Sequence, residues 1–244
     1  MIYLYAIADR PEAPKHSIRG LKNASLSSLP HKDICAVISQ HNVVPPLTEY
    51  NLWRHEAVLE SLMADRAVLP ARFGVVVADE TSVQEALEKR YVDFIADLAR
   101  LRGRVELGLR VLWEDDFTQQ EQISNKPLEE YKSGRDYILA RIEEQRETIN
   151  RRERAEKIAD RVHAQLARLS ADSAHRVLST PRLLLTGAYL VERGTISIFR
   201  DKVASLSADH PALRFLCTGP WPPFNFVKGE PIHICYQTRN DDRA

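Results

Sequence analysis

VELGLRVLW, residues 105–113, alternates apolar side chains with polar or small ones. Successive side chains of a strand point to opposite faces, so this alternation predicts a strand with one buried face. After a polar loop, residues 128–170 contain no proline and a single glycine, Gly134, near the start. That composition predicts one helix of up to about 40 residues, on the order of 60 Å long if it is straight.

Beyond this helix the sequence returns to short apolar runs. One strand is expected around Val177–Leu178, ended by Pro181, and another at Leu183–Val191. Thr195 is a candidate N-cap for a further helix, and Leu213–Thr218 has the composition of a closing strand. With the two preceding elements, these segments give the order βαββαβ of a ferredoxin-like domain, which carries both helices on one face of its sheet.

The part of the chain before this order is less regular. Strands are expected at residues 2–8 and 34–39, followed by a helix at 49–65 that is capped by Thr48. A strand at 68–77, interrupted at Pro70 and Gly74, comes next. A second helix is expected to begin at 79–82 and to end at Gly103. We therefore predict an α+β protein of two domains. Residues 1–103 form a small mixed α/β domain, and residues 104–244 form a ferredoxin-like domain with a long first helix and a C-terminal extension.

Two apolar rows divide the long helix. The first row is Ile138, Ile142 and Ile149, and the second is Ile158, Val162, Leu166 and Leu169. Between the rows lies Asn150–Arg154, which is polar on every side, as in a helix that has left its core. Three interpretations fit this pattern: a solvated mid-section, a protein-binding arm, or an antiparallel helix pair with a break near Asn150.

Composition narrows the class of protein. The 34 basic and 34 acidic residues give a net charge of zero, whereas a dedicated nucleic-acid binder usually has a basic excess. Three widely spaced cysteines do not suggest a disulfide framework, and no apolar run approaches the roughly 18 residues that span a bilayer. The N-terminus lacks the features of a signal peptide, so the expected location is the cytoplasm.

Catalytic and metal-binding motifs are absent from the sequence. It contains no phosphate-binding glycine loop, no HExxH, no GxSxG and no CxxC. Cys217, His233 and Cys235, with His210 not far away, do not match the spacing of a common zinc module, and a packing role suits these cysteines better. His55 is interpreted as a structural hydrogen-bond partner, because adjacent helix residues such as His55 and Glu56 point in different directions. We therefore expect no enzymatic activity, no cofactor and no metal.

Two segments are candidates for protein binding. Arg72 lies beside Phe73 on an irregular strand, and serves either as a bidentate anchor for a carboxylate or carbonyl or as a partner in a salt bridge between elements or domains. The segment GPWPPFNF, residues 219–226, combines three prolines with three large aromatic residues. Such residues dominate interfaces, but they can equally close a core. The candidate residues are Arg72, Phe73, Trp221, Pro222, Pro223, Phe224 and Phe226.

These segments also carry a resemblance to a known family. LPARFG at residues 69–74, with His55 upstream, VEL at 105–107 and GPWPPFNF at 219–226 together resemble the gas vesicle proteins of the GvpL/GvpF family. The resemblance implies an accessory or minor structural component of gas vesicles, the gas-filled shells that give microbes buoyancy. It also implies a ferredoxin-like C-terminal domain. The implied partners are the small hydrophobic shell subunit and other accessory proteins.

Two other functions share the expected fold. RNA-binding domains of this type carry aromatic residues within a basic motif on the central strands, and Leu183–Val191 offers only Tyr189 and no basic residue. A small-molecule-binding protein would need a deep pocket around His55, Arg72 and a carboxylate, which no sequence pattern requires.

Overall fold

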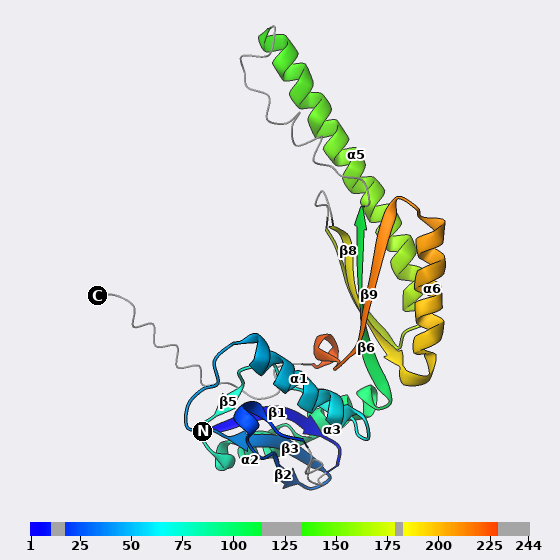
Figure 1. The fold of residues 1–244 in the computed structure, drawn as a ribbon. Coiled ribbons are helices and arrows are strands. Elements are labelled where there is room, and N and C mark those ends of the chain that lie inside the picture. The colour runs from blue at the N-terminus through cyan, green and yellow to red at the C-terminus, as the bar shows by residue number, and fades with distance from the viewer. Residues whose placement is uncertain (11–17, 114–132, 179–182, 229–244) are drawn as a thin grey trace, which may run out of the picture. The chain divides into compact units, whose positions relative to one another are not determined.

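The computed structural model of the 244-residue chain describes residues 1–10, 18–113, 133–178 and 183–228 (Figure 1). Its contacts divide the chain into two compact units. The first unit is Met1–Val105 together with the segment that begins at Trp221, and the second is Glu106–Pro220. Each unit combines helices with one β-sheet, which confirms the predicted α+β class.

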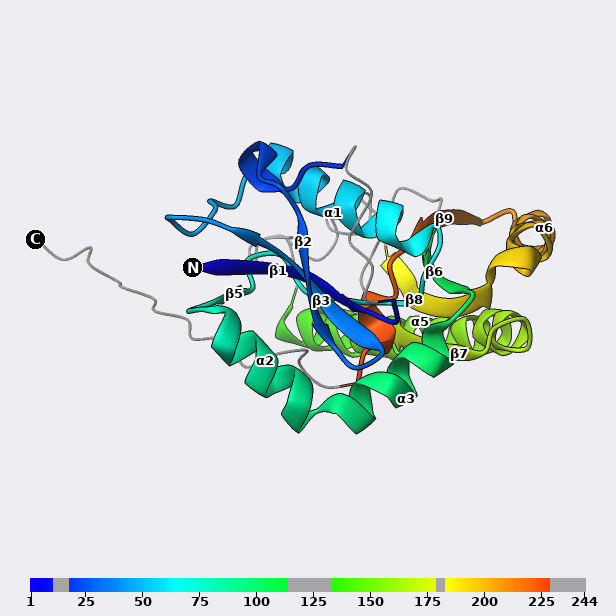
Figure 2. The ribbon, with the colours of Figure 1, turned by 90° about the horizontal axis from the view of Figure 1, so that it is seen from below.

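The first unit is built on a five-stranded sheet in the order β2-β3-β1-β4, with β5 also paired to β1. Its strands are β1 (Ile2–Ala8), β2 (Ser27–His31), β3 (Ile34–Gln40), β4 (Val68–Pro70) and β5 (Val76–Val77). All seven residues of β1 are buried, because both faces of the sheet are covered. Figure 2 shows α1 on one side of these strands and α2 and α3 on the other.

The interrupted strand predicted at residues 68–77 is present as two short strands. β4 and β5 pair antiparallel with opposite ends of β1. Between them the chain leaves the ladder, and the backbone bonds to β1 at its two ends are Ala71 N–H to the Tyr5 carbonyl (2.8 Å) and Leu4 N–H to the Val75 carbonyl (3.0 Å). Gly74, with a φ of +90°, allows the tight turn that this excursion requires.

The helices of the first unit follow the sequence signals with one difference. α1 (Glu49–Met63) begins at Thr48, whose hydroxyl accepts a hydrogen bond from Asn51 N–H, so the predicted cap is confirmed. The prediction of a single helix from residues 79–82 onward is wrong. The chain forms α2 (Glu80–Lys89) and α3 (Tyr91–Leu101), separated by the non-helical backbone of Arg90. The apolar stripe is continuous across this break, so side-chain periodicity alone did not reveal it.

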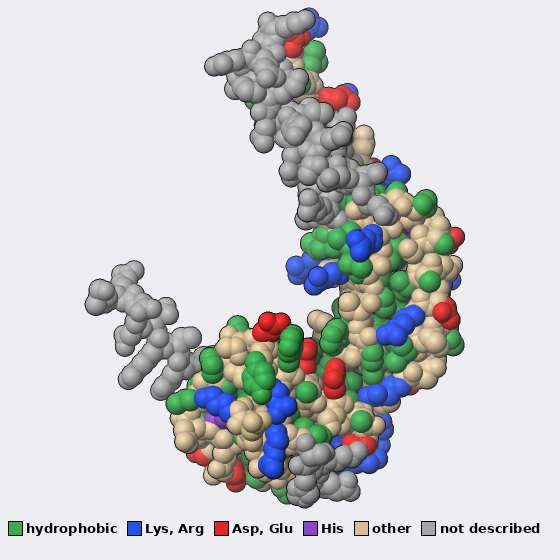
Figure 3. Space-filling model, viewed as in Figure 1, with side chains coloured by type: hydrophobic (Ala, Val, Ile, Leu, Met, Phe, Trp, Pro, Cys, Tyr) green, Lys and Arg blue, Asp and Glu red, His purple; other side chains and the backbone are tan. Residues whose placement is uncertain are grey.

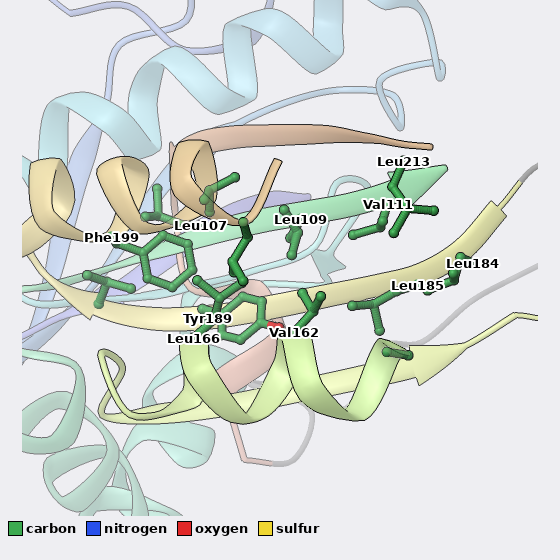
Figure 4. Packing of buried hydrophobic residues seen from close by; sticks show 14 of the residues in the cluster. Leu107, Leu109, Val111, Val162, Leu166, Leu184, Leu185, Tyr189, Phe199 and Leu213 are labelled. Atoms are coloured by element: carbon green, nitrogen blue, oxygen red, sulfur yellow. The ribbon is translucent and has the colours of Figure 1, made fainter. Parts of the chain in front are cut away.

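The second unit is built on a four-stranded sheet in the order β7-β8-β6-β9. Its elements are β6 (Arg104–Trp113), α5 (Gly134–Ala167), β7 (Asp172–Val177), β8 (Leu183–Glu192), α6 (Ile196–Asp209) and β9 (Leu213–Trp221). Figure 4 shows that side chains of the sheet and of both helices meet in one apolar layer. Tyr189 and Phe199 are the largest side chains of this core, and their rings pack 5.2 Å apart.

Only the second half of α5 belongs to this core. Val162 and Leu166 are fully buried, whereas Ile138, Ile142 and Ile149 are between 41% and 58% exposed. A 34-residue helix is about 50 Å long and a ten-residue strand only about 33 Å, so the helix extends past the sheet, as Figure 1 shows. The helix begins after its N-cap Ser133, and the earlier part of the predicted range lies outside the described residues.

Two further expectations need correction. Thr195 precedes α6, but its hydroxyl donates to the Glu192 carbonyl (3.1 Å) and does not cap the helix. The C-terminal extension was expected with the second domain, yet its described part, residues 221–228, groups with the first unit. The reason is a set of hydrogen bonds to α3, described below.

Candidate functional site

The turn that carries Arg72 and Phe73 is fastened to the interior of the first unit. The Tyr3 hydroxyl lies 3.0 Å from His55 Nδ1 and accepts a hydrogen bond from Gly74 N–H (3.1 Å). His55 Nε2 lies 3.0 Å from the Ala71 carbonyl oxygen. The ring of Phe73 packs edge-on against those of Tyr3 and His55, at centroid distances of 6.0 and 5.8 Å. Phe73 therefore points inward and helps to fix the turn.

These contacts show which ring nitrogen of His55 carries the hydrogen. A carbonyl oxygen only accepts, so Nε2 carries the hydrogen and donates to Ala71, while Nδ1 accepts from the Tyr3 hydroxyl. The ring is 2% exposed, and this burial lowers the pKa of His55 from 6.5 to about 4, against the opposing effect of the bond to Ala71. The structural role predicted for His55 is confirmed. Both ring nitrogens are occupied, which leaves neither for acid–base chemistry.

Arg72 differs from its neighbour because its side chain is exposed. The Arg72 guanidinium forms no ion pair or hydrogen bond with the part of the chain that the structure describes. The salt bridge within the chain that the sequence left open is therefore not seen among these residues, and the guanidinium faces solvent.

The C-terminal aromatic segment is largely a packing element. Pro222, Pro223 and Phe226 are buried, whereas Trp221 and Phe224 are half-buried. Trp221 ends strand β9, and Phe224–Phe226 form a short 3₁₀ turn. Of the two alternatives that the sequence left open for this segment, closing a core applies to Pro222, Pro223 and Phe226.

Helix α3 holds this segment in place. The Arg100 guanidinium donates to the Phe226 carbonyl and pairs with the Asp97 carboxylate at 3.0 Å. The same carboxylate accepts a hydrogen bond from Lys228 N–H (3.0 Å). Asp97 is nearly buried, and this pairing with a cation and an N–H group satisfies its charge. The predicted residues therefore contact different elements: Phe73 packs on β1 and α1, while the backbone of residues 226–228 is bound by α3.

A more exposed apolar surface lies at the start of α1 and was not predicted. It consists of Val43, Val44, Leu47, Tyr50 and Trp53, which are between 56% and 74% exposed, and we call it the α1 face. Tyr50 and Trp53 are three residues apart and share the outward side of the helix, while Asn51 and His55 occupy its buried side. Figure 3 shows hydrophobic side chains beside Lys and Arg side chains on the surface of the first unit.

The chain that carries the α1 face is anchored at both ends. His41 N–H donates to the Met1 carbonyl (3.0 Å), and the Asn51 side-chain amide donates to the Pro46 carbonyl (2.8 Å). Pro45 is buried between these points, which turns the flanking valines outward. The sequence signal is a Pro-Pro pair between apolar residues directly before a helix, a pattern that indicates irregular backbone but not an exposed surface. Leu52, next to Trp53 on α1, is also 39% exposed.

No group of three His, Cys, Asp or Glu side chains suited to a metal ion occurs among the described residues. Of the four residues weighed as zinc ligands, His210 and Cys217 are described, whereas His233 and Cys235 lie outside the described ranges. Within the same ranges, no helix is both long and apolar enough to cross a bilayer.

Comparison with known proteins gives a consistent result. The model of the family described as gas vesicle synthesis protein GvpL/GvpF matches residues 1–228. Gas vesicle protein L of Streptomyces sp. (strain CB03234) is 32% identical over 188 residues, which cover 73% of this chain and 70% of that protein. Gas vesicle protein F2 of Halobacterium salinarum is 26% identical over 238 residues and is matched over 93% of its length.

Solved structures share the fold. The crystal structure of GvpF from Anabaena sp. PCC7120 superposes with a TM-score of 0.77 at 24% identity, and covers 93% of this chain and 98% of its own. GvpF from Microcystis aeruginosa gives a TM-score of 0.74 at 20% identity, with 93% of this chain and 99% of its own covered.

Proposed function

The chain belongs to the GvpL/GvpF family of gas vesicle synthesis proteins, and from this premise we propose that it is an accessory protein that binds the hydrophobic shell subunit during gas vesicle assembly. A subunit that lines a gas phase with apolar side chains aggregates if it is left free in water. A protein that covers those side chains before assembly prevents this. The required feature is an exposed apolar surface on a stable fold.

The α1 face is the observation that carries the proposal. Soluble monomers rarely display contiguous large apolar side chains, and such patches mark sites of interaction. Tyr50 and Trp53 bury much area at a small entropic cost, which suits anchor residues of an interface. The hydrogen bonds at His41 and Asn51 hold the preceding segment in position, so binding does not need to order it.

The predicted binding residues take more limited roles in this proposal. Arg72 supplies an exposed cation for a carboxylate or carbonyl of the partner, and Phe73 orients the turn that carries it. Trp221 and Phe224 are half-buried, so each offers part of its ring to a partner. Pro222, Pro223 and Phe226 are buried and act by shaping the segment.

We also propose that the two units are domains, that their boundary in the sequence lies near residue 104, and that the second domain is ferredoxin-like. The support is its element order, βαββαβ, together with a strand order that places the first and third strands in the centre. The proposed role is non-enzymatic and cytoplasmic, at the gas vesicle. In support of the non-enzymatic role, both ring nitrogens of His55, the buried histidine beside the LPARFG turn, make structural hydrogen bonds.

The test is co-purification of the tagged chain with the co-expressed shell subunit. Leu47→Ser combined with Trp53→Ser removes apolar area from the α1 face without touching the core, and we expect it to abolish co-purification. Trp221→Ala with Phe224→Ala reports on the C-terminal segment, and we expect a smaller loss. Ile138→Ser with Leu139→Ser removes exposed apolar side chains from α5 and serves as the matched control. Undiminished co-purification by a folded α1-face variant would rule out this site.

A further inference from the structure

The second unit contains a groove along the middle of α5. Its volume is about 420 Å³, and it is lined by Asn150, Glu153, Arg154, Lys157, Ile158 and Arg161 of α5 and by His210 at the end of α6. From Asn150 to Arg161 the groove follows about three turns of helix, roughly 16 Å. The groove has the length of a short helical segment.

Charge in this groove is unbalanced. Arg154, Lys157 and Arg161 supply three cations, and Glu153 is the single carboxylate among the lining residues. None of the three cationic side chains forms an ion pair or a side-chain hydrogen bond with the described residues. Some basic groups elsewhere on the chain are paired, such as Arg100 with Asp97 and Arg102 with Asp9. Three unpaired cations on one wall attract carboxylates.

Spacing and polarity indicate the form of the ligand. Arg154, Lys157 and Arg161 lie at i, i+3 and i+7, so they share one side of α5 and match carboxylates at the same spacing on a second helix. Ile158 is half-buried in the lining and offers an apolar contact between the charges. Nucleic acid fits less well, because the chain has no net positive charge.

We propose that this groove binds an acidic amphipathic helix of a partner protein. The carboxylates of that helix pair with Arg154, Lys157 and Arg161, and an apolar residue of the helix contacts Ile158. This groove and the α1 face belong to different units, so loss of binding at one leaves binding at the other separately measurable.

The test is fluorescence anisotropy with the full chain and a synthetic helical peptide of leucine, alanine and glutamate, its glutamates at i, i+3 and i+7. We expect Arg154→Gln/Lys157→Gln/Arg161→Gln to weaken binding about tenfold, as the sum of three exposed ion pairs. Charge reversal of the same three residues to Glu weakens it further. Salt weakens binding to the unaltered chain and has little effect on the glutamine variant.

Controls separate this groove from a general effect of charge. Arg135→Glu/Arg146→Glu/Arg214→Glu changes the net charge as much as the reversal variant, and these exposed residues lie outside the lining. Equal loss of peptide binding in both variants would overturn the proposal. So would equal affinity for a peptide with lysine in place of glutamate, or tighter binding of single-stranded RNA or anionic vesicles. Circular dichroism of each variant verifies that α5 is intact.

Discussion

At the scale of single residues, His55 links the start of the chain to the turn at Arg72. Its two ring nitrogens bridge Tyr3 on β1 and the Ala71 carbonyl, so one side chain on α1 fixes a backbone excursion between two strands. The sequence indicated that His55 is structural, because no neighbour on its helix face suits an acid–base pair. Its partners lie 52 and 16 residues away and could not be identified from local spacing.

His55 also predicts how stability depends on pH. Burial lowers the pKa of its imidazole from 6.5 to about 4, so between these values the unfolded chain binds a proton that the folded chain does not. The stabilisation is present above pH 6.5 and is lost as the pH falls toward 4. Between pH 7 and pH 5 we expect a loss of on the order of 2 kcal/mol in the free energy of unfolding.

Urea denaturation of the unaltered chain and of His55→Gln at both pH values measures this effect. The pKa values of His41 and His163 are also lowered by burial, and their contributions are the same in both proteins. The difference between the two pH dependences therefore isolates His55. Parallel dependences would show that folding does not lower the pKa of His55.

Gly20 gives a second prediction at this scale. A Cβ atom at this position would lie 2.3 Å from the Tyr5 hydroxyl, which accepts from Leu21 N–H (2.8 Å) and lies 3.0 Å from Ser39 Oγ. We expect Gly20→Ala to destabilise the first unit by on the order of 2 kcal/mol through overpacking. Tyr5→Phe removes the closest atom, so Gly20→Ala should cost less in that background. A double-mutant cycle in urea measures the coupling, and additive effects would exclude this clash as the cause.

At the scale of elements, α5 shows what periodicity reveals and what it leaves open. The absence of proline predicted one long helix, and the structure contains it. The two apolar rows, however, differ by about 140° around a helix of 3.6 residues per turn. One sheet face cannot cover both, so Val162 and Leu166 are buried while Ile142 and Ile149 are exposed. Of the three interpretations offered by the sequence, the solvated section and the protein-binding arm both agree with these exposures.

The two rows should therefore respond differently to truncation. Val162→Ala removes buried methyl groups from the core of the second unit, and we expect it to cost about 2 kcal/mol. Ile142→Ala, at an exposed position, should change stability by no more than about 0.5 kcal/mol. Thermal denaturation followed by circular dichroism compares them. An equally large cost at Ile142 would mean that another surface covers the first row.

Other elements also differ in whether nearby residues determine them, and only those determined locally were predicted from the sequence. The strands at Ile2–Ala8 and Leu183–Glu192 and the cap at Thr48 follow from residues within a few positions, and the sequence predicted them. The break at Arg90 interrupts a stripe whose apolar spacing is unchanged, so no local pattern marked it. The α1 face was missed because an exposed Trp53 and a buried one look alike in sequence.

At the scale of the whole molecule, the chain returns to its first unit after completing the second. Residues 221–228 group with Met1–Val105, where Asp97 and Arg100 bind the backbone of Phe226 and Lys228. These partners are more than 120 residues apart, and the sequence contains no signal that joins them. The aromatic residues of this segment suggested a surface, whereas Phe226 belongs to the interior.

The packing of this segment in the first unit predicts which elements a cavity at Phe226 destabilises. Phe226 is 5% exposed, so Phe226→Ala should cost about 3 kcal/mol, and hydrogen exchange should accelerate in α3 while β7 and β8 keep their protection. Phe199→Ala, a cavity in the core of the second unit, is the matched control and should loosen β8 and α6 instead. If Phe226→Ala accelerated hydrogen exchange in β8 and left α3 protected, the segment would belong to the second unit. Because α3 is bound to this segment by Asp97 and Arg100, we expect exchange in Tyr91–Leu101 to report its release first.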